Sequence, residues 1–160
     1  MEGRQPCVYM GVWGIWMAGF MQFLTGVYLF VGLTWFNSFR APALYMAALA
    51  FTAYGVHWFA IGTNRLRRAD PRPSGFMAVA FMFISILGII VFLSNNDASV
   101  AGVFIGLTAV YVSEFFSTFH IGGDIGEKAL GFFRLGTGFW LIYLTFAFTL
   151  NITSGYHLWT

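Results

Sequence analysis

Three ionisable side chains, His57, Glu114 and Arg134, lie inside long apolar segments of the sequence. At a rise of 1.5 Å per residue, each falls about 7 Å from the middle of its segment, toward the same face of a membrane. A carboxylate beside an arginine stays ionised, and histidine exchanges a proton near neutral pH. One interpretation is therefore a buried polar cluster that binds an anion or relays protons. The other is a charge-neutralised pair that holds helices together, with Arg134 extending toward the membrane surface.

The composition decides the class of protein that carries these side chains. Of 160 residues, 59% are hydrophobic, 21% are aromatic and only 9% are charged. In a typical soluble domain, about a quarter of all residues are charged, and they cover its surface. Cys7 is the only cysteine, which excludes an intrachain disulfide and a multi-cysteine zinc site. We therefore expect a membrane protein that crosses the bilayer several times, and no binding of nucleic acid, since basic residues are few and clustered.

The apolar segments are long enough to cross a bilayer, which takes about 20 residues each. The sequence predicts an all-α helical bundle with five transmembrane helices, at about 8–32, 42–63, 75–95, 99–119 and 127–150. The polar stretches between them are too short to fold alone. Residues 1–160 are therefore expected to form a single transmembrane domain.

The basic residues predict the orientation, because lysine and arginine gather on the cytoplasmic side of membrane proteins. With the N-terminus inside, the outer side carries Arg40 alone. The inner side would carry Arg4, Arg65, Arg67, Arg68, Arg72 and Lys128. We therefore expect an N-inside, C-outside protein of the inner or plasma membrane. Aromatic residues that follow the first and last spans suit a belt at the outer surface: Trp35, Phe36, Tyr156 and Trp159.

Motifs for catalysis and for cofactors are absent from the sequence. It contains no nucleophile elbow, no phosphate-binding glycine loop and no H-E-x-x-H zinc motif. We expect no enzymatic activity, no catalytic residues, no metal site and no cofactor. A haem held between helices by His57 and a second ligand stays open as a minor alternative.

Two short patterns resemble the acetate uptake transporter family, the succinate–acetate permease-like proteins. The first is Gly19-x-x-Gln22-x-x-x-Gly26, and the second, more specific one runs from Ala50 to Trp58 and reads A-F-T-A-Y-G-x-x-W. Weaker matches lie downstream at Leu107-Thr108, Gly131, Leu135, Gly138, Tyr143-Leu144 and Leu150-Asn151. The chain is a divergent match, because the family's first helix and its N-P-x-P-x-G signature have no counterpart in residues 1–8.

The resemblance implies a compact helical channel or proton-coupled carrier for acetate and similar small carboxylates, assembled as a ring of identical subunits. It implies a substrate path lined by Gln22, Tyr54 and Leu107, with the last two in the positions of the family's narrow gate. His57, Glu114 and Arg134 would form an inner polar layer below this path.

Two functions are consistent with these residues. The first is a membrane channel or proton-coupled carrier for acetate-like monocarboxylates, in which hydroxyl and amide donors guide a weak acid. The alternative is a non-catalytic accessory subunit of a larger respiratory, photosynthetic or oxidase complex. Its support is the aromatic content, which suits surfaces that pack against other helices, lipids or pigments. In both cases we expect contact with the lipid bilayer, and either copies of this chain or other membrane subunits as partners.

Overall fold

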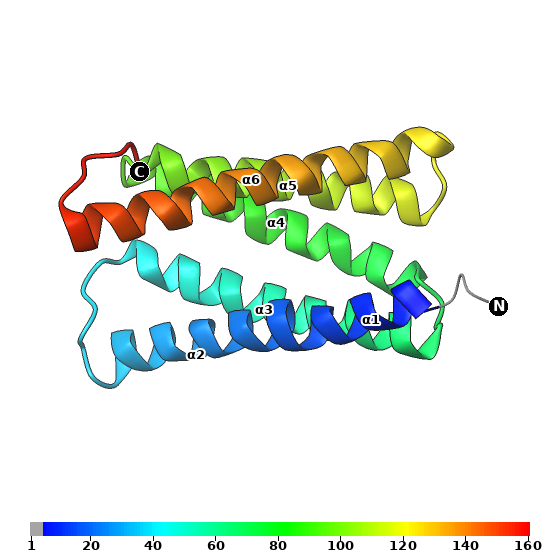
Figure 1. Cartoon of the computed structure of the whole chain (residues 1–160), viewed down its shortest axis with the longest axis horizontal. Helices are drawn as coiled ribbons and strands as arrows, with labels where there is room; N and C mark the ends of the chain where they lie inside the picture. The colour runs from blue at the N-terminus through cyan, green and yellow to red at the C-terminus, as the bar shows by residue number, and fades with distance from the viewer. Residues whose placement is uncertain (1–4) are drawn as a thin grey trace. The chain divides into compact units, whose positions relative to one another are not determined.

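The computed structural model describes residues 5–160, with side chains described from Tyr9 onward. The part of the chain that it describes is helical and contains no strand. The elements are α1 (Gln5–Trp13), η2 (Gly14–Phe20), α2 (Met21–Thr34), α3 (Ala43–Arg67), α4 (Arg72–Ser94), α5 (Ala98–Thr118) and α6 (Asp124–Ser154). Figure 1 shows α1, η2 and α2 as one continuous run antiparallel to α3. Arg4, one of the basic residues behind the predicted orientation, lies outside the described residues.

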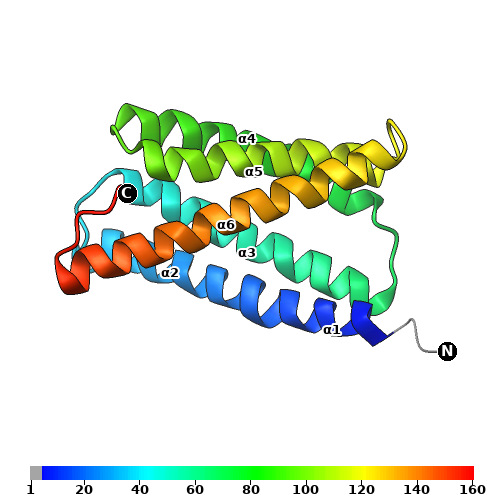
Figure 2. The ribbon, with the colours of Figure 1, turned by 45° about the horizontal axis from the view of Figure 1, so that its top comes forward.

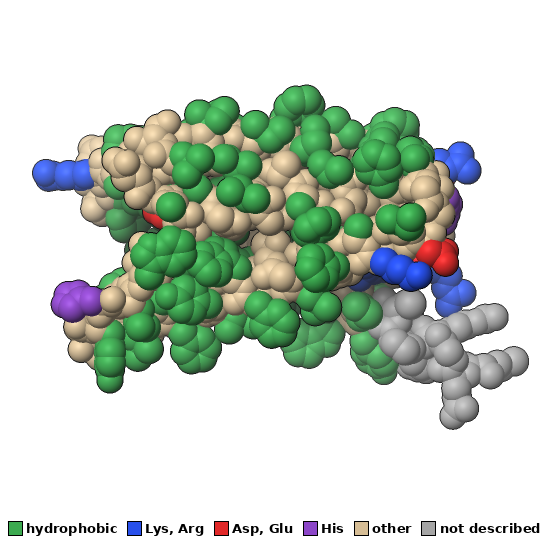
Figure 3. Space-filling model, turned by 90° about the horizontal axis from the view of Figure 1, so that it is seen from above, with side chains coloured by type: hydrophobic (Ala, Val, Ile, Leu, Met, Phe, Trp, Pro, Cys, Tyr) green, Lys and Arg blue, Asp and Glu red, His purple; other side chains and the backbone are tan. Residues whose placement is uncertain are grey.

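The five predicted spans are confirmed. Among the described residues, five helices are long and apolar enough to cross a membrane, at Tyr9–Thr34, Ala43–Arg67, Arg72–Ser94, Ala98–Thr118 and Asp124–Ser154. Hydrophobic side chains cover much of the face seen in Figure 3, and charged ones lie mainly near its two ends. The chain is therefore an all-α integral membrane protein, whose orientation remains a prediction.

The last span differs from its predicted limits of 127 and 150. It begins at Asp124 and ends at Ser154. Asp124 and Glu127 lie in its first turn, where carboxylates favour a helix because they face unpaired backbone N–H groups. The helix therefore takes in polar residues that the sequence assigns to a loop.

The contacts within the chain fall into two compact units, residues 1–77 and 78–160. The single transmembrane domain remains a prediction, and each unit is described by itself below.

In the first unit, α3 packs directly on the helical run from α1 to α2, along a line of small residues. A Cβ atom added to Gly55 would lie 2.6 Å from the backbone nitrogen of Phe23, and one added to Gly62 would lie 2.7 Å from the carbonyl oxygen of Gly11. A Cβ on Gly26 would lie 2.6 Å from the backbone nitrogen of Thr52. Glycine at these positions lets the two backbones approach as closely as small residues do in other membrane helices.

The π-helical segment η2 keeps this line of contacts in register. Gly19 comes eight positions after Gly11, whereas their partners on α3, Gly55 and Gly62, are seven positions apart. Eight residues of α-helix turn about 80° beyond two full turns, whereas seven fall about 20° short of them. A π-helix bonds residue i to i+5 and so accommodates one extra residue. Because η2 begins after Gly11 and contains Gly19, its extra residue lets both glycines face α3.

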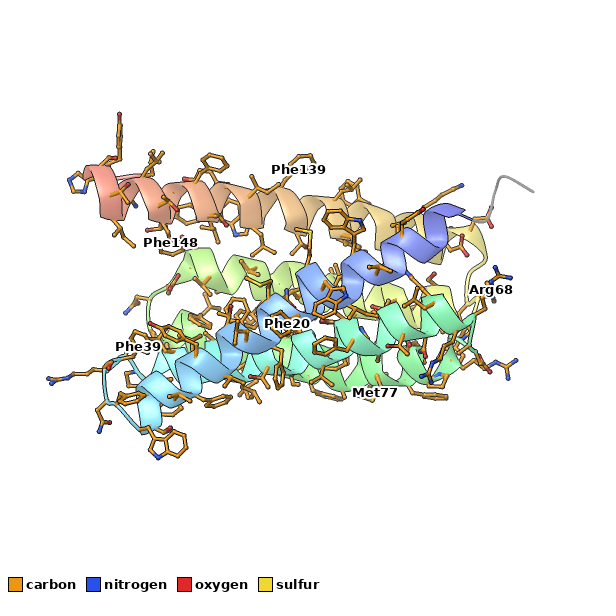
Figure 4. The ribbon with its side chains drawn as sticks, turned by 60° about the horizontal axis from the view of Figure 1, so that its bottom comes forward. Phe20, Phe39, Arg68, Met77, Phe139 and Phe148 are labelled. Atoms are coloured by element: carbon orange, nitrogen blue, oxygen red, sulfur yellow. The ribbon has the colours of Figure 1, made fainter. Side chains whose placement is uncertain are left out.

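The turn from α3 to α4 carries basic residues. Arg65 and Arg67 lie in the last turn of α3, where cations offset the partial negative charge of the exposed carbonyl groups. Arg68 ends the helix in a left-handed conformation, with φ 52°. Figure 4 shows Arg68 at this end of α3. Asp70 then accepts a hydrogen bond from the backbone N–H of Arg72.

In the second unit, α4 and α5 form a helical hairpin. Their turn ends at Asp97, whose carboxylate accepts a hydrogen bond from the backbone N–H of Val100 at 2.9 Å and caps α5. The rings of Phe92 and Phe104 stack with centroids 5.3 Å apart. Phe104 also lies against Gly88, where any added Cβ would collide with its ring.

The last two helices, α5 and α6, are also antiparallel and in close contact. Gly102 faces Trp140 and Gly106 faces Thr137, while near the other end Gly126 on α6 faces the backbone of Ser117. The G-x-x-x-G pair of α5 therefore forms part of this interface, and α6 provides the side chains that fill it.

Candidate functional site

The second unit contains an ion pair at membrane depth. Nη2 of Arg134 on α6 lies 3.3 Å from Oε2 of Glu114 on α5. The Glu114 side chain is 9% exposed, whereas that of Arg134 is 35% exposed. An ionisable group inside a bilayer is costly and usually lies against a partner or a polar path. The Glu114 side chain is therefore enclosed, while part of the Arg134 side chain stays accessible.

The direction in which helical side chains lean explains why these two residues meet. Gly106 faces Thr137 and Ser117 faces Gly126, so Glu114 lies opposite a point about one and a half turns before Arg134. Side chains lean toward the N-terminus of their own helix. Because α5 and α6 run in opposite directions, Glu114 and Arg134 lean toward each other and close the offset.

Polar side chains other than this pair are also buried in the second unit. Ser113 precedes Glu114 and is buried, as is Tyr111 one turn earlier. Thr137 is buried against Gly106, one turn beyond Arg134. Thr137 thus adds a polar side chain to the α5–α6 interface near the pair, whereas Tyr111 packs against Phe81 of α4.

His57, the third member of the predicted cluster, belongs to the first unit. It lies on α3 and is buried, with 4% of its surface exposed. The ion pair thus joins two of the three residues that the sequence places at one depth. The cluster of all three remains a prediction.

The predicted path residues are divided between the units. Gln22 on α2 and Tyr54 on α3 belong to the first unit, and Leu107 on α5 belongs to the second. Tyr54 is buried, and Leu107 is half-buried. Oε1 of Gln22 is buried without a hydrogen-bond partner among the described residues. A buried amide oxygen costs free energy unless a donor reaches it, so Gln22 is a position where a polar group could bind.

The residues that carry the family resemblance are packing residues in this chain. Gly19 and Gly26, from the first pattern, contact Gly55 and Thr52, from the second. Both patterns therefore describe one helix–helix contact of the first unit. Gln22 and Tyr54 add an amide and a hydroxyl group to this contact region.

Sequence reasoning missed a second polar cluster, at the end of α6. Nε1 of Trp140 donates a hydrogen bond to the carbonyl oxygen of Ser99 at 3.0 Å. The side-chain amide of Asn151 donates to the carbonyl oxygen of Leu158 at 2.9 Å and its oxygen accepts from the N–H of Leu158 at 2.8 Å. Nothing in the local sequence signals these contacts, because the first depends on the packing of α6 on α5 and the other two depend on residues 155–160 folding back along α6.

Groups of three or more metal-binding side chains are absent from the part of the chain whose side chains are described. No protein-family model matches the chain. Neither a curated protein nor a solved structure matches it.

Proposed function

We propose that this membrane protein is a channel or proton-coupled carrier for acetate-like small monocarboxylates. The observation that carries the proposal is the position of Arg134: it lies within a spanning helix, pairs with the enclosed Glu114 and keeps 35% of its side chain accessible. A fixed, accessible cation at membrane depth attracts an anion that would otherwise be excluded from the bilayer. Arginine also binds a carboxylate with two parallel hydrogen bonds.

The other polar residues have complementary roles in this proposal. Glu114 neutralises Arg134 while no substrate is bound, so the site carries no net charge at rest. Gln22 and Tyr54 supply amide and hydroxyl donors, and Leu107 narrows the path. His57 exchanges the proton that accompanies a weak acid. The proposal includes association of identical chains, residence in the inner or plasma membrane, and neither a cofactor nor an enzymatic step.

Uptake into proteoliposomes tests the proposal. Labelled acetate should enter liposomes that contain the protein faster than empty liposomes, under an imposed pH gradient. Arg134→Gln should abolish this difference, and Arg134→Lys should retain part of it because the charge is kept. Arg72→Gln is the matched control, since Arg72 pairs with Asp70 at 3.7 Å and both side chains are exposed. Uptake equal to that of empty liposomes would disprove the proposal.

A second function, that of an accessory subunit in a larger membrane complex, is favoured by one face of α6. Phe132, Phe139 and Phe146 recur every seven residues and are 72%, 70% and 66% exposed. Figure 4 labels Phe139 on this helix. Such a row suits packing against another helix or a pigment. Purification in mild detergent distinguishes the two functions: other subunits or a bound chromophore would favour the second, and a homo-oligomer the first.

A further inference from the structure

The last helix is much longer than its neighbour in the second unit. α5 has 21 residues and α6 has 31. At 1.5 Å per residue these lengths are about 32 and 46 Å, against a hydrocarbon core of about 30 Å. α5 therefore matches the core, and α6 exceeds it by about ten residues.

The extra residues of α6 all lie at its C-terminal end. Ser117 faces Gly126 and Gly106 faces Thr137. These two pairs, near opposite ends of the contact, give the same antiparallel register of α5 against α6. In this register the end of α5 lies level with the start of α6. Ala98, the first residue of α5, lies level with about Thr145. Residues 146–154 therefore project about 14 Å beyond α5. Figures 1 and 2 show the red end of α6 extending past the green ends of α4 and α5.

Residues 155–160 fold back along this projection. Gly155 ends α6 in the left-handed conformation, with φ 67°, and so reverses the chain. Asn151 then makes its two hydrogen bonds with the backbone of Leu158. The hydroxyl of Tyr143 donates to the carbonyl oxygen of Trp159 at 2.9 Å. The ring of Trp159 lies 5.5 Å from that of Trp140, which returns the segment to the level of the first turn of α5.

The backbone of this returning segment limits where the hydrocarbon core can end. Residues 155–159 are exposed and belong to no helix. Irregular backbone exposed to lipid does not occur within hydrocarbon, where unpaired N–H and C=O groups cost several kcal/mol each. The core must therefore end at or before the level of Tyr143 and Trp159.

The α4–α5 turn gives the same boundary independently. Asn95, Asn96 and Asp97 lie just before α5 and so close to the level of residue 145 on α6. A core that reached Leu150 would cover this polar turn. Aromatic rings, in contrast, are favoured where hydrocarbon meets headgroups. The turn and the rings of Trp140, Tyr143 and Trp159 thus belong at one membrane surface.

We propose that the membrane surface crosses the second unit at the level of Tyr143, and that residues 146–160 form a hairpin outside the hydrocarbon core. Its exposed Phe146 lies in the headgroup layer, which is about 5–7 Å thick. Asn151 and Thr153 reach the water beyond it. This inference does not depend on the transport proposal.

Cysteine labelling in native membranes tests the boundary. Cys7→Ser removes the only native cysteine. Single cysteines are then placed at exposed α6 positions, at Thr149 and Thr153 on the projection and at Leu135 and Phe139 within the core. A membrane-impermeant maleimide should label the first two and spare the last two. All four should react after denaturation in sodium dodecyl sulfate, which shows that each thiol is competent.

Two results would overturn the proposal. One is protection of Thr149→Cys in membranes to the same degree as Leu135→Cys, which would place the projection in hydrocarbon. The other result concerns the side of the membrane from which labelling occurs. The proposal requires that Asn95→Cys, in the α4–α5 turn, is labelled from the same side as Thr153→Cys. Labelling from opposite sides would contradict the shared surface.

Discussion

Arg134 and Glu114 form an ion pair whose partners differ in their surroundings. Nη2 of Arg134 lies 3.3 Å from Oε2 of Glu114, and the Glu114 side chain is enclosed while the Arg134 side chain is partly accessible. An enclosed charge that loses its partner has no solvent to compensate it. A partly accessible arginine can instead extend its long side chain toward the membrane surface. The two partners should therefore not be equally costly to remove.

We predict that Arg134→Gln destabilises the protein more than Glu114→Gln does. Removing the arginine takes the Arg134 charge away from the buried Glu114, at a cost of about 3 kcal/mol, the lower end of the range for broken buried pairs. Removing the glutamate leaves an arginine that can reorient. The double variant should recover most of the loss. The free energy of unfolding in mixed micelles, followed by circular dichroism, measures all three variants, and equal losses for the two single variants would contradict the argument.

Two glycine substitutions should have opposite effects. Gly55→Ala places a methyl group 2.6 Å from a backbone nitrogen, which cannot move aside as a flexible side chain can. We expect a loss of about 3 kcal/mol, at the upper end of the cost of overpacking. Gly136→Ala on α6 is the control, because no atom lies within 4 Å of its added Cβ. It should be neutral or stabilise the helix by up to about 1 kcal/mol. The temperature midpoint of unfolding in detergent compares the two.

The spans and the depth of the ion pair follow from sequence, whereas the contacts between helices do so only in part. Apolar length alone predicts the five helices, because a bilayer imposes a minimum span. Depth counting places Glu114 and Arg134 in one layer, but only the register of α5 on α6 brings them together. The spacing of Gly11, Gly19, Gly55 and Gly62 is visible in the sequence. It predicts a helix–helix contact only once α3 is known to pack against the run from α1 to α2. The folded-back segment has no such signal, since Asn151 and Leu158 meet through a chain reversal at Gly155.

The Asp97 cap should contribute to stability through its oxygen rather than its charge. Its carboxylate accepts a hydrogen bond from the N–H of Val100 and so pairs one of the free donors at the start of α5. Asp97→Ala should cost about 1 kcal/mol, and Asp97→Asn should cost much less because the amide oxygen also caps a helix. Unfolding midpoints in detergent provide the measurement. An equally large loss in Asp97→Asn would show that charge matters instead.

Deletion of one residue from η2 should be tolerated where deletion from α2 is not. Deleting Met17, which is exposed, shortens the spacing from Gly11 to Gly19 from eight positions to seven. Seven positions is also the spacing from Gly55 to Gly62. The segment can then continue as α-helix, and both glycines still face α3. Deleting Leu24, also exposed, shortens the spacing from Gly19 to Gly26, which is already seven positions, to six. It turns Gly26 away from Thr52 by about 100°. We expect the Met17 deletion to fold with an unfolding midpoint close to that of the parent protein, and the Leu24 deletion to lose yield and stability. Equal damage from both deletions would show that η2 does not serve to keep the glycines in register.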